Sequence, residues 1–378
     1  MTVLRVAVNL LFLRPGRVGG SEVYCREILT ELASRGDARL QIIGTRAMVE
    51  SLGRFPADFE IFDLGWPYGP KRILAEQVGV CLAARRYRAG VLWSPGNFGP
   101  VFQDRMLPQV ITVYDLQHKH IPEHFSLSTR IARTILMRLS LHHATHIIAI
   151  SRFTAEDLVQ RLGVSANKVT VVHLGSPRHA VPNDSDVGQA LERHGVRKPY
   201  FYYPATLAPH KNHAVVIDAL AAAARLMPVP DLVLTGDPST RMGALNRIVR
   251  TAGMEGKVRH LGYVGREDVL RLTRGATAMV FPSQFEGFGL PLVEAMAMGT
   301  PVIASEAAAI PEVVGDAALL VNPLDVQAWV EAICLVTSDD ATRTRLVNRG
   351  EVRAKAFDWG TCADATHRVL SEAGSAAS

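Results

Sequence analysis

Residues 281–294, FPSQFEGFGLPLVE, combine a turn, a Gly-Phe-Gly loop and the start of a helix. The apolar run TAMVF at 277–281 leads into this stretch and predicts a buried strand. Pro291 suits the first helical position, because its fixed φ is helical and its missing N–H is not needed there. Gly299 predicts the end of that helix. The stretch therefore predicts a strand–loop–helix unit, with Glu286 in the loop and Glu294 in the first helical turn.

The loop and the helix start bring anion-binding and hydroxyl-binding groups together. Backbone N–H groups of residues 287–290 face outward at a helix N-terminus, which carries about half a positive charge and binds anions. Carboxylates such as Glu286 and Glu294 accept hydrogen bonds from hydroxyl groups. A nucleotide-sugar is anionic at its diphosphate and hydroxylated at its sugars, so it fits both. In the alternative, Glu294 complements the helix dipole and Glu286 is a solvated acid, which leaves an exposed Phe288 without a role.

Three runs carry a resemblance to a known family. They are Phe281-Pro-Ser, Glu286-Gly-Phe-Gly-Leu-Pro and Glu294-Ala-Met-Ala-Met-Gly-Thr-Pro-Val-Ile-Ala-Ser. Together they resemble the signature of the family 4 retaining glycosyltransferases, in which two glutamates separated by seven residues mark the donor site. The resemblance implies an α/β protein of the GT-B class, with two Rossmann-like, doubly wound parallel-sheet domains that face each other across a cleft. It also implies a transfer that needs no metal and no cofactor besides the donor.

Composition sets broad limits. With 378 residues, 48 % apolar and 20 % charged, the chain is long enough for two domains with separate cores. No apolar run reaches the roughly 18 residues of a membrane span, and we interpret the N-terminus as a first buried strand. Four scattered cysteines without a C-x-x-C pair indicate reduced thiols and a cytoplasmic location. His142 and His146 are four residues apart, but no acid accompanies them as a metalloprotease motif requires, and we expect no metal site.

Charge is unevenly spread along the chain. Residues 1–178 contain 22 Lys and Arg against 14 Asp and Glu, a balance of +8, whereas residues 179–378 contain 19 against 22, a balance of −3. The basic half suits an acidic membrane surface, which would place the protein peripherally on the inner face of the membrane, or a lipid-phosphate or polyanionic acceptor. Ordinary solvated charge remains the alternative. Nucleic acid is disfavoured, because aromatic residues do not alternate with the basic ones.

Strand and helix patterns alternate along the chain, and the strands are continuously apolar, which predicts parallel sheets covered on both faces. We predict a first domain over residues 1–178, a linker within 177–198 and a second domain over 195–356. In the resembling family a terminal helix, here 357–375, crosses back onto the first domain. Ser21 is predicted to cap the first helix, and the family's glycine-rich loop at the donor diphosphate corresponds to Gly20.

The segment after the strand PQVITV is a candidate acceptor site. Asp115 and His118 lie at a strand's carboxyl end, where catalytic side chains gather in open α/β sheets. They could hold a sugar hydroxyl or orient an acceptor; the alternatives are a helix-capping Asp and a surface His. Many members of the resembling family have a His-Asp pair here, whereas this chain has Tyr114-Asp115. Whether Tyr114 or His118 replaces the missing histidine stays open.

A basic turn is the second candidate for binding the diphosphate. His210-Lys211-Asn212 lies between a predicted strand and a helix, and a lysine there is a point charge suited to phosphate. The resemblance supports Lys211 and, less directly, His210, while Thr206 stands where many members have an arginine. The run YYPATLAPHKNH resembles bacterial mannosyltransferases that build O-antigen, capsule or exopolysaccharide. It favours GDP-mannose as the donor, with UDP-glucose, other hexoses and rhamnose donors open.

The sequence thus predicts a hexosyltransferase that moves a sugar from a nucleotide-sugar to a glycan or polyprenyl-linked acceptor. Alternatives are a sugar-nucleotide 2-epimerase with the same architecture, a non-catalytic partner subunit, and a nicotinamide oxidoreductase, which the absence of G-x-G-x-x-G disfavours. Glu286 would steady the transferred hexose, and Glu294 would hold the ribose hydroxyls. The predicted catalytic residues are Glu286, Asp115 and His118, and the predicted donor-binding residues are Gly20, His210, Lys211, Gly287, Phe288, Gly289, Leu290 and Glu294.

Overall fold

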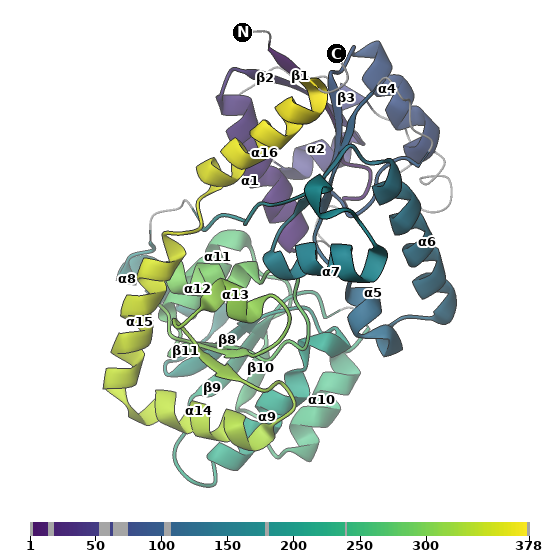
Figure 1. Cartoon of the computed structure of the whole chain (residues 1–378). Coiled ribbons are helices and arrows are strands. Elements are labelled where there is room, and N and C mark those ends of the chain that lie inside the picture. The colour runs from purple at the N-terminus through teal and green to yellow at the C-terminus, as the bar shows by residue number, and fades with distance from the viewer. Residues whose placement is uncertain are drawn as a thin grey trace. The chain divides into compact units, whose positions relative to one another are not determined.

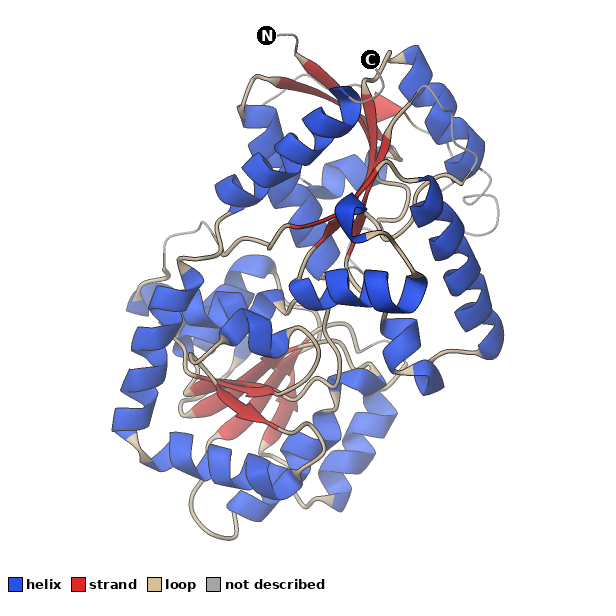
Figure 2. Cartoon of the chain, in the orientation of Figure 1, coloured by secondary structure: helices blue, strands red, loops and turns tan. Residues whose placement is uncertain are grey.

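The computed structural model describes residues 3–13, 19–52, 61–62, 75–101, 107–177, 181–238 and 240–375. The chain forms two compact units. The first unit is Met1–Gly175 together with Asp358–Ser378, and the second unit is Ser176–Phe357. In each unit a parallel sheet has helices on its two faces (Figures 1 and 2). The predicted α/β class, with two doubly wound parallel sheets, is therefore confirmed.

The first unit contains a seven-stranded sheet in the order β3-β2-β1-β4-β5-β6-β7. Its central strands are buried along their whole length, which explains why their sequences are continuously apolar. The strand order reverses direction between β1 and β4, and open α/β sheets bind ligands at the carboxyl ends of strands at such a point. The strands are β1 (Leu4–Asn9), β2 (Ala38–Ile43), β3 (Ile61–Phe62), β4 (Val91–Ser94), β5 (Gln109–Val113), β6 (His146–Ala149) and β7 (Val169–Val171).

Helices of the first unit connect these strands. Ser151 caps α7 as its sequence position suggests, with its hydroxyl accepting a hydrogen bond from the Thr154 N–H at 3.1 Å. The prediction that Ser21 caps the first helix is wrong. Helix α1 begins at Gly20, so Gly19 is its N-cap residue and Ser21 is the second residue of the helix. The helices are α1 (Gly20–Ser34), α2 (Arg46–Leu52), the π-turn η1 (Ala75–Gly79), α4 (Val80–Arg86), α5 (Gln117–His120), η2 (Pro122–His124), α6 (Leu127–His143), α7 (Arg152–Leu162) and η3 (Ala166–Lys168).

The C-terminal helix α16 (Trp359–Ser375) belongs to the first unit. Figure 1 shows this yellow helix beside the purple α1, and the side chains of α16 also pack on β4, β5 and β6. Trp359 is buried directly against Gly175, where a Cβ atom would come within 2.4 Å of the indole. Arg35 in turn forms an ion pair with Asp364. Helix α16 therefore contributes to the hydrophobic core of the first unit.

The second unit contains a six-stranded sheet in the order β10-β9-β8-β11-β12-β13, and its order reverses between β8 and β11. Helix α8 lies in the segment for which we predicted a linker, and α8 packs on α11 in this unit. The strands are β8 (Tyr200–Pro204), β9 (Asp231–Thr235), β10 (Val258–His260), β11 (Ala278–Phe281), β12 (Val302–Ser305) and β13 (Leu319–Val321).

Helices cover both faces of the second sheet (Figure 2). Across the parts of the chain that the structure describes, no helix is long and apolar enough to cross a bilayer. The helices are α8 (Asp184–His194), η4 (Pro209–Lys211), α9 (His213–Ala223), α10 (Met242–Thr251), α11 (Arg266–Gly275), α12 (Leu290–Ala297), α13 (Ile310–Val314), α14 (Val326–Ser338) and α15 (Asp340–Ala354).

Candidate active site

Lys211 and Glu286 meet at the switch point of the second sheet. Lys211 follows β8 and Glu286 follows β11, and these two strands are neighbours. The Lys211 ammonium lies 2.6 Å from Glu286 Oε1, and the two side chains are only 18 % and 15 % exposed. A cation and a carboxylate predicted from separate motifs therefore form one partly buried ion pair, at the sheet edge where α/β proteins bind ligands.

Main-chain contacts hold the two loops of this ion pair together. The carbonyl of His210 accepts hydrogen bonds from Gln284 N–H at 2.8 Å and from the Ser283 hydroxyl at 3.3 Å. The buried Tyr203 hydroxyl donates to the carbonyl of Lys211 at 2.9 Å. Asn212 adopts a left-handed conformation and ends the turn. The position of Lys211 is thus fixed by backbone contacts on both sides, before any ligand is present.

A second ion pair, which the sequence analysis missed, involves the other glutamate. Arg266 Nη2 lies 2.5 Å from Glu294 Oε1, and Glu294 is only 3 % exposed. Arg266 is the first residue of α11, where the helix dipole disfavours a cation. That unfavourable position is the sequence signal that could have suggested a partner for Arg266. The pair compensates the burial of the Glu294 carboxylate, which would be costly alone.

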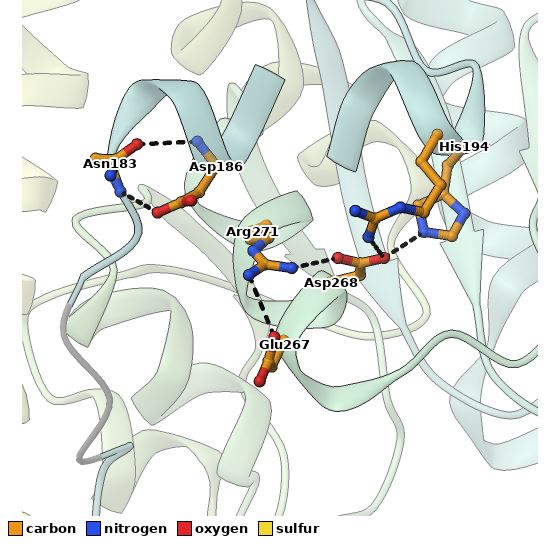
Figure 3. Close-up of polar contacts among 7 residues, drawn as sticks. Asn183, Asp186, His194, Glu267, Asp268 and Arg271 are labelled. Carbon is orange, nitrogen blue, oxygen red and sulfur yellow. Dashed lines mark hydrogen bonds and ion pairs between the residues drawn. The ribbon is translucent and has the colours of Figure 1, made fainter. Parts of the chain in front are cut away.

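Helix α11 is anchored to α8 by the carboxylate of Asp268 (Figure 3). Arg193 and His194 of α8 contact Asp268 Oδ2 at 2.6 and 2.9 Å, and Arg271 of α11 contacts Oδ1 at 2.9 Å. Burial alone would raise the pKa of Asp268, but these hydrogen bonds lower it to about 2. Figure 3 also shows the reciprocal cap of α8 by Asn183 and Asp186. Since Asp268 is two residues after Arg266, this network fixes the helix start that carries Arg266.

The glycine-rich loop differs from the sequence prediction in two respects. Phe288 is not exposed: it is 97 % covered and packs edge-on against Phe357, with ring centroids 5.6 Å apart, where the apolar ring is shielded from water. Helix α12 begins at Leu290, so Pro291 is its second residue and Glu294 its fifth, at the beginning of the second turn. Gly289 has φ +101°, which favours glycine. Gly299 ends the helix with φ +67°, as predicted.

Phe288 is only 3 % exposed. Its burial leaves the backbone of residues 287–290, rather than the aromatic ring, as the part of the loop suited to a ligand. Glu286 is tied to the next loop by its carbonyl, which accepts the Ala309 N–H at 3.3 Å. The anion-binding role of these N–H groups remains a prediction.

His213 shows how strongly the basic turn is desolvated. It is the first residue of α9, and its ring lies 4.9 Å from that of Tyr203. Burial, followed by the nearby His260, Lys211 and His210, lowers the pKa of His213 to about 3. At neutral pH this imidazole is therefore uncharged, and the ammonium of Lys211 is the cation next to Glu286.

In the first unit, the predicted acceptor residues lie close together after β5. Asp115 Oδ1 accepts a hydrogen bond from the Gln117 N–H at 3.0 Å at the start of α5, although the N-cap residue of this helix is Leu116. His118 is buried rather than on the surface, and its Nε2 atom has no hydrogen-bond partner among the described residues. Burial and the cations Lys119, Arg133 and Arg130 lower its pKa to about 4. His118 is thus a neutral imidazole at pH 7.

Tyr114 stands at the position where many members of the resembling family have a histidine. Its hydroxyl donates to the carbonyl of Pro95, and its ring packs edge-on against Tyr24 at 5.7 Å. Gly20 is the first residue of α1 and is exposed, while residues 14–18 of its loop lie outside the described ranges. In the described part of the chain, no group of three His, Cys, Asp or Glu residues could hold a metal ion.

Comparisons with known proteins place these features in a family. Residues 18–177 match the family described as Glycosyltransferase Family 4, and residues 190–353 match Glycosyl transferases group 1. The chain is 31 % identical over 295 residues to the O-antigen chain mannosyltransferase B of Escherichia coli, covering 75 % of this chain and 74 % of that protein. The chain is a family 4 glycosyltransferase. The resemblance found in the sequence is thus confirmed, and so is transferase activity.

Two further relatives cover nearly the whole glycosyltransferase. The D-inositol 3-phosphate glycosyltransferase of Corynebacterium glutamicum is 24 % identical, over 92 % of this chain and 90 % of that protein. Anabaena HepE, solved in complex with UDP and glucose, superposes with a TM-score of 0.76 at 21 % identity, covering 98 % of this chain and 100 % of HepE. The likeness to solved glycosyltransferases of this kind shows the GT-B fold.

Proposed function

We propose that this glycosyltransferase moves mannose from GDP-mannose to a saccharide or polyprenyl-linked acceptor, with retention at the anomeric carbon. The observation that carries the proposal is the pairing of Lys211 with Glu286, together with the buried Glu294–Arg266 pair in the same unit. Mannose is supported by the name of the Escherichia coli relative, an O-antigen chain mannosyltransferase. A glycosyltransferase takes a glycosyl donor and an acceptor, and the second unit supplies the groups that suit a donor.

In this proposal each group meets the part of the donor that complements it. The ammonium of Lys211 and the N–H groups of residues 287–290 bind the diphosphate. The carboxylate of Glu294, oriented by Arg266, accepts the two vicinal ribose hydroxyls. Glu286 binds hydroxyls of the hexose and stabilises the cationic character that develops at its anomeric carbon. His210, in the same turn as Lys211, adds to the donor-binding groups of the second unit, and the role of Gly20 at the diphosphate stays a prediction.

The Lys211–Glu286 pair gives the site a defined resting state. Without donor, the two charges neutralise each other across 2.6 Å. An arriving diphosphate competes for the ammonium, so the same event that binds the phosphate frees the Glu286 carboxylate for the hexose. Because both side chains are largely covered, this exchange occurs with little bulk water and each charge is weakly screened.

The chemical step we propose is a front-face displacement. The bond from the anomeric carbon to the diphosphate oxygen breaks, the acceptor oxygen bonds to the same face of that carbon, and the acceptor proton passes to the departing phosphate. Lys211 and the helix N-terminus stabilise the charge on that leaving group, so no divalent ion is required. Asp115 and the neutral His118 of the first unit orient the acceptor hydroxyl.

We place the reaction in the cytoplasm, a proposal supported by four cysteines that are all free thiols. The test of function is a donor comparison by calorimetry and by product analysis, using GDP-mannose, UDP-glucose, GDP and UDP. We expect GDP-mannose to bind most tightly and to be hydrolysed slowly without acceptor, giving mannose in the α configuration first. Preference for a uridine donor would overturn the donor assignment, and an epimerised nucleotide-sugar would favour the epimerase alternative.

A further inference from the structure

Helix α6 presents an aliphatic stripe to solvent. Leu127, Ile131, Ile135 and Leu139 are 66, 51, 53 and 45 % exposed. They are spaced four residues apart, so they form one continuous row along the helix. The opposite face of α6 is the one that packs on the sheet, through Met137 and Leu141 in the core with Leu116. Amphipathic packing thus accounts for one face of α6 and leaves the other unexplained.

The stripe is unusual within this protein. In the described residues, the exposed aliphatic side chains on other helices occur singly or in pairs, as with Val352 on α15 or Leu335 on α14. Isolated exposed aliphatics are ordinary in soluble proteins, whereas a continuous row marks an interaction surface. Figure 1 shows α6 at the outer edge of the first unit.

The charge around the stripe is entirely of one sign on this helix. Helix α6 contains Arg130, Arg133 and Arg138 and no Asp or Glu. Arg133 and Arg138 are exposed, and Lys119 of α5 adds a fourth cation. Over residues 117–143 there are four Lys and Arg against one acid, Glu123, a balance of +3.

The carboxylate packed against these elements does not cancel that charge. Asp157 of α7 is already engaged by His120 and by Arg161, the latter at 2.8 Å. Burial, followed by repulsion from Arg138, Arg130 and Arg161, lowers the pKa of Lys119. The cations therefore lie close enough to repel one another, and an anionic partner would relieve that repulsion.

We propose that the outer face of α6 docks on a bilayer surface that contains anionic phospholipid. Leu127, Ile131, Ile135 and Leu139 insert at the level of the headgroups, while Arg133 and Arg138 extend along them to lipid phosphates. Long cationic side chains combine an apolar stem with a charged end, which suits this boundary. Aliphatic residues with no aromatic platform fit lipid rather than single-stranded nucleic acid. This surface does not depend on which donor the enzyme uses.

The test is co-sedimentation of the full chain with vesicles of phosphatidylcholine alone or with phosphatidylglycerol. We expect binding only to the anionic vesicles, weakened by added salt. Arg133→Gln/Arg138→Gln should lower the apparent affinity about thirtyfold. Ile131→Ser/Ile135→Ser should lower it about tenfold or more. The matched control, Leu335→Ser/Val352→Ser, removes two exposed helix aliphatics elsewhere and should bind as the parent does.

Several outcomes would overturn this proposal. It is overturned if the parent protein does not bind anionic vesicles at any salt concentration, or if the Ile131→Ser/Ile135→Ser variant binds like the control. If analytical ultracentrifugation shows that the parent protein is a dimer and that the Ile131→Ser/Ile135→Ser variant is a monomer, the stripe is a self-association surface instead. Thermal unfolding and calorimetric GDP binding of each variant show that the fold and the donor site are intact, so a failure here is distinct from a failure of the proposed function.

Discussion

Arg266 Nη2 and Glu294 Oε1 lie 2.5 Å apart, which joins the first residue of α11 to the fifth residue of α12. The carboxylate is almost fully buried, while the guanidinium side chain is 27 % exposed. A buried carboxylate that is meant to accept ribose hydroxyls must be correctly oriented before the donor arrives. The contact with Arg266 fixes that orientation, and we propose Arg266 as a positioning residue of the donor site.

Removal of this cation should affect both stability and donor binding. We expect Arg266→Ala to lower the free energy of unfolding by about 2–3 kcal/mol, less than for a fully buried pair because Arg266 is partly exposed. The KM for the donor should rise about tenfold or more, while Arg266→Lys recovers part of both losses. Arg250→Ala, at an exposed pair with a 4.0 Å separation, is the control. An Arg266→Ala enzyme with parental donor KM would contradict the assigned role.

Lys211→Ala removes the ammonium proposed to bind the diphosphate. A charge-assisted contact of about 1.5–3 kcal/mol corresponds to a roughly 10- to 150-fold loss of affinity for GDP. Isothermal calorimetry of GDP and GDP-mannose measures this loss directly. Lys257→Ala, at the exposed pair with Asp231 in the same unit, should leave the affinity unchanged. Equal affinities of the two variants would exclude Lys211 from the phosphate site.

Glu286→Gln should separate binding from turnover. The substitution keeps the size of the side chain but removes the negative charge that would stabilise the anomeric carbon in the transition state. We expect kcat to fall about 100-fold or more, equivalent to about 2.7 kcal/mol, with GDP affinity within a few-fold of the parent. Glu255→Gln, an exposed residue, is the matched control. Retention of parental kcat by Glu286→Gln would remove this residue from the mechanism.

His118 should make the free energy of unfolding depend on pH. Its pKa is lowered from 6.5 to about 4 in the folded protein, so the unfolded chain binds a proton that the folded chain does not. The contribution of His118 to the free energy of unfolding is therefore fully present above pH 6.5. It is lost as the pH falls from 6.5 toward 4, and the loss is at most about 3 kcal/mol. His118→Gln should flatten this dependence in urea denaturation curves. His213, with a pKa near 3, remains in the variant and contributes with the same sign.

The proposed absence of a metal requirement has a direct test. Transfer measured after exhaustive dialysis against EDTA should proceed at close to the parental rate, because Lys211 and backbone N–H groups stabilise the leaving diphosphate. Added Mg²⁺ or Mn²⁺ should change the rate less than twofold, well under the several kcal/mol that a catalytic metal supplies. Loss of activity in EDTA that Mg²⁺ restores would overturn this part of the mechanism.

Local sequence was sufficient where one segment determines the feature. The apolar run before Phe281 forms β11, and Gly299 ends α12. Lys211 and Glu286 were predicted from separate motifs, and they meet in the structure because β8 and β11 are adjacent strands. In each case the information lies within a few residues, or in the topology that parallel strands impose.

The sequence was insufficient where burial depends on distant segments. Phe288 looked exposed because it lies between glycines, whereas its ring is buried and packs against Phe357. His118 lies in the polar run Gln117–His120, yet the helices around it bury the ring. Arg266 was missed because its partner is 28 positions further along the chain, at Glu294. These features arise from tertiary contacts that have no local pattern.

The order in which the chain builds its two units decides which segments can be exchanged between related glycosyltransferases. Since the first unit needs Asp358–Ser378 as well as Met1–Gly175, and since Trp359 fills the space over Gly175, a simple N-terminal fragment lacks part of its own interior. An exchange of donor preference between enzymes of this family therefore requires an internal cassette, here 176–357, grafted at two junctions at once. A single-crossover chimera would inherit a mismatched closing helix, and its loss of activity would say nothing about sugar recognition.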